Sequence, residues 1–320
     1  MPSEFDIIEQ YFSRNNTDHS SVHLSIGDDA AITSVPTGMQ QVIAIDTLVE
    51  NIHFKKETSA YNIAYKALAV NLSDLAAMGA KPCWFTLALT LPDINTAWLA
   101  DFSKGLFTLA DQYNMQLIGG DTTRGPLAVT IQIAGHIPQG KALLRSGAKA
   151  GDYIYVTGNI GDGRAGLAAQ EADLHDSDAE YLVQRLQQPT PRVNTGESLI
   201  GMASACIDVS DGLVADLSHI LQASGVGASI DLDKMPLSLA CEHKRELFNL
   251  SCLQLAQSGD DYELCFTVPE KNISMLACTC DELGVEVTQL GQVEKDIGLR
   301  CYEKGNLLDI SQAGYQHFYP

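Results

Sequence analysis

The spacing of apolar residues along the chain predicts helices alternating with strands. Small and apolar residues run from Ala60 to Met78 and stop at Gly79, which is typical of a buried helix with a glycine after its last turn. Apolar positions at helical spacing predict a second long helix from Thr96 to Tyr113 and a short amphipathic helix from Ser3 to Ser13. Shorter apolar runs in this half predict strands at 41–47, 85–91, 115–118 and 127–137.

The second half repeats a strand–helix–strand pattern after a polar, turn-rich stretch, 138–150, which we interpret as a linker. The predicted strands are 153–157, 205–209, 228–232, 262–268 and 285–290, and the predicted helices are 212–223, 271–283 and one after the glycine-rich run 158–166. This order of elements predicts an α/β chain with two domains, residues 1–137 and 151–320.

Net charge limits the partners that this chain can bind. Its 320 residues carry 40 Asp and Glu against 20 Lys and Arg, for a formal net charge of -20. A surface this acidic repels nucleic acid and anionic lipid, so we expect neither as a partner. It also repels phosphorylated metabolites unless cations accompany them.

The sequence also bears on the cellular compartment. No apolar window approaches the length of a membrane span, and the first residues lack the pattern of a secretory signal. None of the eight Cys forms a C-x-x-C pair or has zinc-finger spacing. We therefore expect a reduced, cytoplasmic protein.

Two glycine motifs resemble nucleotide-binding loops but lack essential parts of them. Residues 135–141 have the spacing G-x-x-x-x-G-K, yet Ala142 follows where a P-loop needs Ser or Thr, and we predict a hairpin turn instead. Residues 161–166 read G-x-G-x-x-G, but no strand ending in an acidic residue follows at the required distance. A tight strand-to-helix turn is the better interpretation of that run.

Aspartates at the ends of predicted elements are the candidate functional groups. Taken singly, each of them is better explained as a turn residue or a helix cap than as a functional group. Asp74 is harder to explain in that way, because it lies near the negative end of the 60–78 helix, beside apolar residues, where a carboxylate needs a nearby cation. Asn71 shares its helix face. Asp208 and Asp211 flank a strand-to-helix turn, which can aim both carboxylates at one metal ion beside a phosphate-binding helix N-terminus.

Matching motifs, in order along nearly the whole chain, resemble those of the thiamine-monophosphate kinase family. They are IGDDAA at 26–31, DTLV at 46–49 with HF at 53–54, ALAVNLSDLAAMGA at 67–80, LIGGDTTRGP at 117–126, RSGA at 145–148 with GD at 151–152, IDVSDGL at 207–213, DYELCF at 261–266 and GYQHF at 314–318. Jointly these motifs are far more specific than any one of them.

The resemblance implies a kinase that uses ATP and several Mg²⁺ ions to convert thiamine monophosphate to thiamine diphosphate by direct in-line transfer. It implies the two-domain α/β fold of aminoimidazole ribonucleotide synthetase, with an N-terminal domain whose sheet forms a homodimer interface. By position, the implied metal ligands are Asp29, Asp46, Asp74, Asp121, Asp208 and Asp211; the implied ATP contacts are Gly120, Asp121, Arg145 and Ser210; and the implied thiamine contacts are His53, Asp260 and Tyr315. Asp208, Asp211 and Arg145 are the expected catalytic residues.

The sequence departs from the family pattern at two places. Ala44 and Ile45 stand where hydroxyl residues are common, so only Asp46 is an expected ligand there, and Asp260 replaces the usual Glu with a side chain one methylene shorter.

Two alternatives to the kinase function remain open. One is another ATP-dependent synthetase of the same fold, although a selenophosphate-type enzyme would need a reactive Cys earlier than Cys83. The other is a non-catalytic divalent-cation-binding protein.

Overall fold

The computed structural model describes residues 4–14 and 20–310, and the chain divides into two compact units. The first unit comprises Met1–Leu75 and Ala80–Gly140, and the second comprises Ala76–Gly79 and Lys141–Pro320. Within the described ranges, no helix has the length and apolar character needed to cross a membrane.

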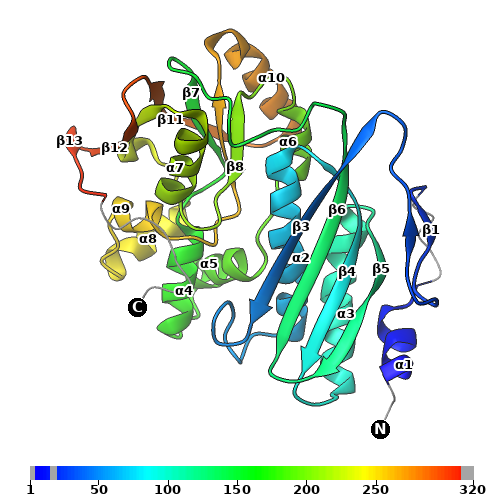
Figure 1. Cartoon of the computed structure of the whole chain (residues 1–320). Helices are drawn as coiled ribbons and strands as arrows, with labels where there is room; N and C mark the ends of the chain where they lie inside the picture. Colours follow the sequence, from blue (N-terminus) through cyan, green and yellow to red (C-terminus); the bar gives the residue numbers. More distant parts are fainter. Residues whose placement is uncertain (1–3, 15–19, 311–320) are drawn as a thin grey trace. The chain divides into compact units, whose positions relative to one another are not determined.

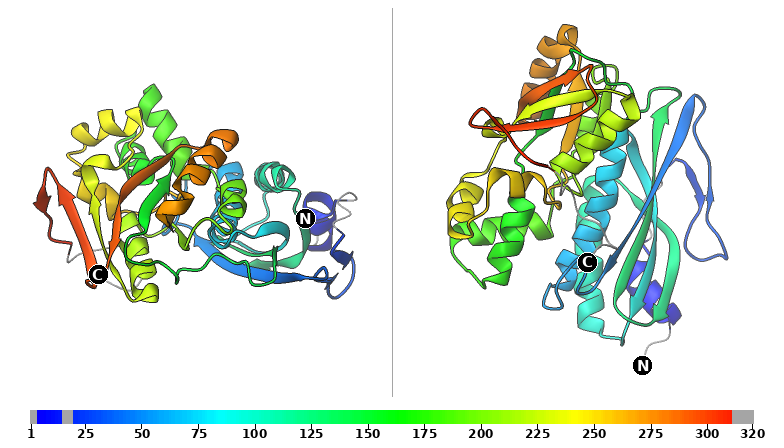
Figure 2. Two further views of the ribbon diagram at one scale, coloured as in Figure 1. Left: turned by 90° about the horizontal axis from the view of Figure 1, so that it is seen from above. Right: turned by 60° about the vertical axis from the view of Figure 1, so that its left-hand side comes forward.

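The first unit is built on a four-stranded sheet with two long helices against one face (Figures 1 and 2). The strand order is β3 (Met39–Val49), β6 (Ala128–Pro138), β4 (Lys81–Leu91) and β5 (Gln116–Arg124), and only β4 and β5 are parallel. The helices are α2 (Ala60–Met78) and α3 (Thr96–Gln112). Alternation along β6 places Val129, Ile131 and Ile133, all fully buried, on the same face of the sheet.

The N-terminal segment packs on α3 through its second helical turn. It comprises α1 (Glu4–Ile7), a π-helical turn η1 (Ile8–Phe12) and, further along, the antiparallel pair β1 (Val22–Leu24) and β2 (Ile32–Thr33). The Arg14 guanidinium donates to both carboxylate oxygens of Asp111 at 2.8 and 2.9 Å and lies 3.7 Å from the centroid of the Phe107 ring. This combined ion pair and cation–π contact holds the end of η1 beside α3.

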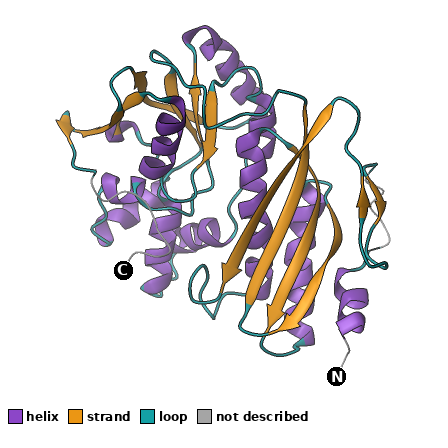
Figure 3. Cartoon of the chain, in the orientation of Figure 1, coloured by secondary structure: helices purple, strands orange, loops and turns teal. Residues whose placement is uncertain are grey.

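The second unit contains a seven-stranded sheet, ordered β13-β12-β9-β11-β7-β10-β8, in which only β9 and β12 are parallel (Figure 3). Its strands are β7 (Tyr153–Thr157), β8 (Ala205–Asp208), β9 (Gly227–Asp231), β10 (Leu264–Val268), β11 (Val287–Glu294), β12 (Gly298–Glu303) and β13 (Asn306–Leu307). Its helices are α4 (Asp162–Glu171), α5 (Ser177–Gln187), α6 (Val193–Ser198), α7 (Leu213–Ser224), α8 (Leu239–Leu247), α9 (Cys252–Ala256) and α10 (Ile273–Leu283), with 3₁₀ turns η2 (Leu232–Lys234) and η3 (Glu270–Asn272).

Most of the predicted elements are confirmed. The helix predicted at 60–78 is α2, and the one predicted at 96–113 is α3, which ends one residue earlier. The predicted strand-to-helix turn at 161–166 is also confirmed, because α4 begins at Asp162. The predicted hairpin at 135–141 is wrong: β6 continues to Pro138, and the chain then leaves the sheet, so no returning strand pairs with it.

Helices α2 and α3 approach each other closely at Gly105. A Cβ added there would lie 2.2 Å from the carbonyl oxygen of Tyr61 in α2. We predict that Gly105→Ala lowers the free energy of unfolding by about 2 kcal/mol, because overpacking outweighs the better helix propensity of Ala. Thermal unfolding checks this, with Lys104→Ala on the exposed side of α3 as the control. Equal midpoints for the two variants would contradict the prediction.

Candidate active site

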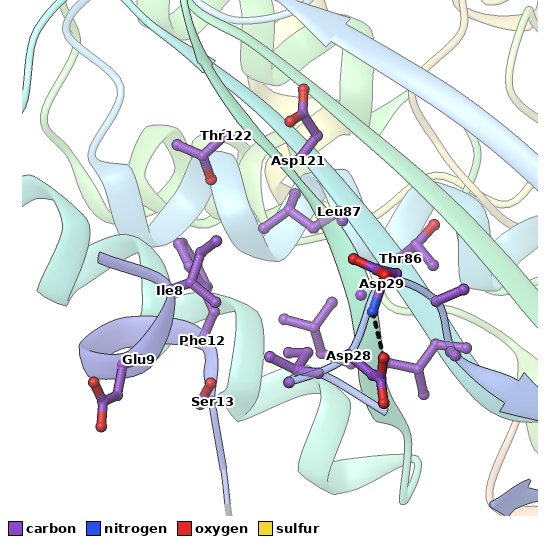
Figure 4. Close-up of a pocket in the computed structure, with 18 residues that line it drawn as sticks. Ile8, Glu9, Phe12, Ser13, Asp28, Asp29, Thr86, Leu87, Asp121 and Thr122 are labelled. Carbon is purple, nitrogen blue, oxygen red and sulfur yellow. Dashed lines mark hydrogen bonds between the residues drawn. The ribbon is translucent and has the colours of Figure 1, made fainter. Parts of the chain in front are cut away.

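A cavity in the first unit brings together part of the predicted site (Figure 4). Its volume is about 740 Å³, and its walls come from η1, the turn at 26–31, β4 and β5. Asp29, Gly120 and Asp121 line it together with Asp28, whose carboxylate accepts the Asp29 backbone N–H at 2.9 Å. Ile8 and Phe12 face the same cavity from η1. The cavity thus combines acidic and apolar walls.

Local backbone geometry explains how these residues reach the cavity. Gly27 has φ +122°, a conformation that a residue with a side chain rarely adopts, and it turns the chain into Asp28 and Asp29. At Gly120 a Cβ would lie 1.9 Å from the Leu87 carbonyl oxygen, so only glycine lets β5 run this close to β4 immediately before Asp121.

Two other predicted ligands in the first unit do not line this cavity. Across the sheet, Asp46 pairs with Ile131, and Ile131 pairs with Leu87, so these three side chains lie on one face. Asp121 pairs instead with Ala88, the residue after Leu87. Because successive residues of a strand point to opposite faces, Asp46 and Asp121 lie on opposite faces of the sheet. Asp74 lies in α2, a partly exposed position in an otherwise buried stretch of helix.

Hydrogen bonds to the backbone orient the side chains of Asn71 and His53. Asn71, one turn before Asp74, is fully buried, and its amide donates to the Ala67 carbonyl at 2.9 Å. Its carbonyl oxygen Oδ1 accepts no hydrogen bond from the described residues. His53 follows β3, and its Nδ1 accepts the Val49 backbone N–H at 3.0 Å, which fixes the orientation of the ring.

In the second unit β8 ends at Asp208, and the turn that follows carries Ser210 and Asp211. Asp216, in the first turn of α7, accepts the backbone N–H groups of Ser210 and Asp211, both at 3.0 Å. Burial and the nearby charges of Asp208 and Asp211 together raise the pKa of Asp216 to about 7, although the two N–H bonds act in the opposite direction. Sequence reasoning missed Asp216; an acid in the first turn of a predicted helix was the available signal.

The predicted substrate residue Asp260 lies against this turn. Its backbone N–H donates to the Ser210 carbonyl at 3.0 Å, and its carboxylate accepts the Tyr262 hydroxyl at 3.1 Å. The structure therefore brings Ser210, Asp211 and Asp260 together. Arg145 lies before β7 with an exposed side chain, and its carbonyl accepts the Ser224 hydroxyl at 3.3 Å. Tyr315 lies outside the described residues.

Buried carboxyl groups follow Asp260 in the sequence, at Asp261 and Glu263. Asp261 accepts the backbone N–H groups of Gly161 at 2.8 Å and Gly163 at 3.0 Å, and burial holds its pKa well above the usual range despite these bonds. Glu263, fully buried, accepts from Arg192 Nε at 2.6 Å and from Arg185 at 3.1 Å. Sequence reasoning assigned no role to this network, because residues far apart in sequence form it.

The predicted ligand positions in each unit offer oxygen donors. Within 4–14 and 20–310, no three His, Cys, Asp or Glu side chains group closely enough to hold a metal by themselves. Mg²⁺ is usually held by one or two carboxylates together with water and phosphate oxygens, so a complete protein cage is not required. Paired aspartates such as Asp208 and Asp211, and the buried Oδ1 of Asn71, are oxygen atoms of the kind that Mg²⁺ prefers.

Comparisons with known proteins agree along the whole chain. Residues 27–137 match the family "AIR synthase related protein, N-terminal domain", and residues 149–303 match its C-terminal counterpart. The chain is 50% identical over 320 residues to the thiamine-monophosphate kinase of Salmonella typhimurium, covering 98% of each sequence.

Solved structures show the same similarity. The crystal structure of thiamine-monophosphate kinase from Stenotrophomonas maltophilia K279a is similar with a TM-score of 0.84 and 41% identity, covering 91% of this chain and 93% of that one. AaThiL complexed with AMPPCP and TMP is similar with a TM-score of 0.80 and 28% identity, covering 98% and 97%. These matches confirm the expected two-domain α/β fold.

The buried carboxylate of Glu263 provides a test of the network behind the site. We predict that Glu263→Gln lowers the free energy of unfolding by about 3–5 kcal/mol, because it removes the buried carboxylate that pairs with Arg192 and one of the two carboxylates beside Arg185. The control is Glu294→Gln, which removes a surface pair with Arg300 and should cost about 1 kcal/mol or less. Urea unfolding measures both, and equal losses would show that the buried network adds no stability.

Proposed function

Because the chain belongs to the thiamine-monophosphate kinase family, we propose that it transfers the γ-phosphoryl group of ATP to the phosphate of thiamine monophosphate. The products are thiamine diphosphate and ADP. The observation that carries this proposal is the 50% identity to a thiamine-monophosphate kinase over 98% of both sequences. The related AaThiL, solved with AMPPCP and TMP, supports the same pair of ligands.

The acceptor needs little chemical activation. A phosphate monoester has a second pKa of about 6, so its oxygens are mostly ionised near neutral pH and no strong general base is needed. The main barrier is repulsion between two anionic phosphates. Arg145 would place a fixed positive charge near the polyphosphate, and Gly120, Asp121 and Ser210 would contact ATP. We propose Asp208 and Asp211, with Arg145, as the catalytic residues.

Mg²⁺ is the second part of the proposal. When bound, it neutralises phosphate charge and helps to align donor and acceptor. We propose that Asp29, Asp46, Asp74, Asp121, Asp208 and Asp211 hold several such ions. The support is an all-oxygen donor set with the cavity at Asp29 and Asp121 and the turn at Asp208 and Asp211. Ala44 and Ile45 beside Asp46 offer no side-chain oxygen.

His53, Asp260 and Tyr315 are the proposed thiamine contacts. Asp260 is already oriented by the Tyr262 hydroxyl, and His53 by the backbone of β3. Tyr315 would stack on the cationic ring, an interaction worth about 1 kcal/mol.

We also propose a cytoplasmic location and the domain limits 1–137 and 151–320 with a linker at 138–150. All eight cysteines are free in the structure, as suits a reducing compartment. The family matches at 27–137 and 149–303 support the domain limits.

We predict that ADP forms from ATP only when thiamine monophosphate and Mg²⁺ are both present. A coupled ADP assay measures this, with EDTA and with thiamine monophosphate omitted as the two controls. ADP formation at the same rate without thiamine monophosphate would favour another ATP-dependent enzyme of this fold. No ADP under any condition would favour a cation-binding protein without catalysis.

The open face of the first-unit sheet supports a homodimer. Ile43 and Ile45 on edge strand β3 are 53% and 62% exposed, although isoleucine on a sheet usually packs against another surface. We predict that Ile43→Glu converts a dimer to a monomer in sedimentation experiments. Ile297→Glu, at an 81% exposed position in the second unit, should leave the dimer intact. A monomeric unaltered protein, or a dimeric Ile43→Glu variant, would contradict this prediction.

A further inference from the structure

Three turns of the second unit meet backbone to backbone. The first is 158–163, from the end of β7 into the first residues of α4; the second is 209–212 after β8; and the third is 258–263 before β10. Three backbone hydrogen bonds join the second and third turns: Asp260 N–H to Ser210 at 3.0 Å, Tyr262 N–H to Val209 at 2.8 Å, and Val209 N–H to Glu263 at 2.7 Å. We call these three turns, with their connecting bonds, the turn cluster.

Glycines lie where the turns touch. A Cβ at Gly259 would lie 1.9 Å from the Ser210 carbonyl oxygen, and one at Gly212 would lie 2.7 Å from the backbone of Gln257. A Cβ at Gly163 would lie 2.7 Å from the Asp260 carbonyl oxygen. Any of these side chains would push the turns apart, so the close contact between the turns requires glycine at these positions.

The third turn has an unfavourable backbone conformation. Asp260 has φ +72° and Tyr262 has φ +53°, both in the left-handed region, although neither is glycine. Such conformations persist only where surrounding contacts hold them. The backbone bonds to Val209 and Ser210 hold one side of the turn, and Asp261 lies between these two strained residues.

Asp261 supplies the contact on the other side. Its side chain is 2% exposed, and its two carboxylate oxygens each accept one backbone N–H, from Gly161 and Gly163. This carboxylate is therefore the side-chain connection between the first and third turns. Its neighbour Asp260 is only partly buried and carries the proposed thiamine contact.

We propose that Asp261 is a positioning residue, which acts through the turn cluster to set the place of Asp260 for thiamine monophosphate and of Ser210 for ATP. The inference rests on the proposed kinase function. It assigns Asp261 no contact with either substrate. Its contribution is to hold the strained turn in the one arrangement in which Asp260 faces the substrate.

Two variants disturb the same contact in different ways. Asp261→Asn keeps the size of the side chain but replaces one accepting oxygen with an NH₂ group, which cannot accept a backbone N–H. Gly163→Ala leaves Asp261 and both N–H groups in place but pushes a methyl group against the Asp260 carbonyl. Alanine is favoured over glycine within α4, so this variant does not depend on loss of helix stability.

Steady-state kinetics at saturating ATP and Mg²⁺ test the proposal on the full chain. We expect Asp261→Asn to raise the KM for thiamine monophosphate about tenfold, the cost of losing one buried hydrogen bond. We expect Gly163→Ala to raise the same KM, because its methyl group displaces the Asp260 backbone. The control is Asp152→Asn, because Asp152 is similarly buried and accepts the Lys149 N–H at 3.0 Å away from the turn cluster. Its KM should stay within twofold of that of the unaltered protein.

A purely structural role would give a different result. Loss of folded protein lowers the apparent kcat and the melting temperature but leaves KM unchanged, so an unchanged KM in Gly163→Ala would overturn the proposal. If Asp261→Asn does not fold, Gly163→Ala decides alone. Failure of the kinase function itself is distinguishable, because the unaltered protein would then release no ADP in response to thiamine monophosphate.

Discussion

Close backbone contact between turns is the constraint on which the second unit depends. The turns after β7 and β8 and before β10 approach so closely that glycine is required at Gly163, Gly212 and Gly259. Several backbone N–H groups in these turns bond to side chains of the protein. Buried carboxylates supply their acceptors: Asp216 for Ser210 and Asp211, and Asp261 for Gly161 and Gly163. The functional residues project from a backbone that is fixed in this way.

Acidic side chains therefore have two different kinds of surroundings in this chain. Asp216, Asp261 and Glu263 are buried and bind backbone N–H groups or arginine, and burial raises the pKa of the first two. Asp29 and Asp121 are exposed at a cavity, where they are available to a ligand. The net charge of -20 is consistent with substrates whose phosphates are accompanied by cations.

Sequence predicted local structure well and tertiary partners poorly. Helix α2 follows directly from its run of small apolar residues and its terminal glycine, and the turn at Gly161 follows from its glycines. The pairing of β8 with β10, and the mainly antiparallel second sheet, do not follow, because strand order depends on contacts between distant segments. The strand–helix–strand pattern alone is compatible with a parallel or an antiparallel sheet.

Some residues of the candidate site could be recognised from the sequence, and others needed the structure. Asp208 and Asp211 were recognisable from their position around a turn, and the resemblance to a family supplied His53 and Asp260. Asp261 was visible only as part of a motif, since its partners Gly161 and Gly163 lie about a hundred residues earlier. The placement of Asp46 and Asp121 on opposite faces of one sheet likewise required the observed strand register.

The fate of the γ-phosphoryl group of ATP tests the account most directly. The protein would be incubated with Mg²⁺, thiamine monophosphate and ATP labelled in its γ-phosphate, and the products separated. Direct transfer predicts that the label appears in the terminal phosphate of thiamine diphosphate, with one ADP formed for each. Label released as inorganic phosphate, or formation of AMP, would contradict phosphoryl transfer to thiamine monophosphate.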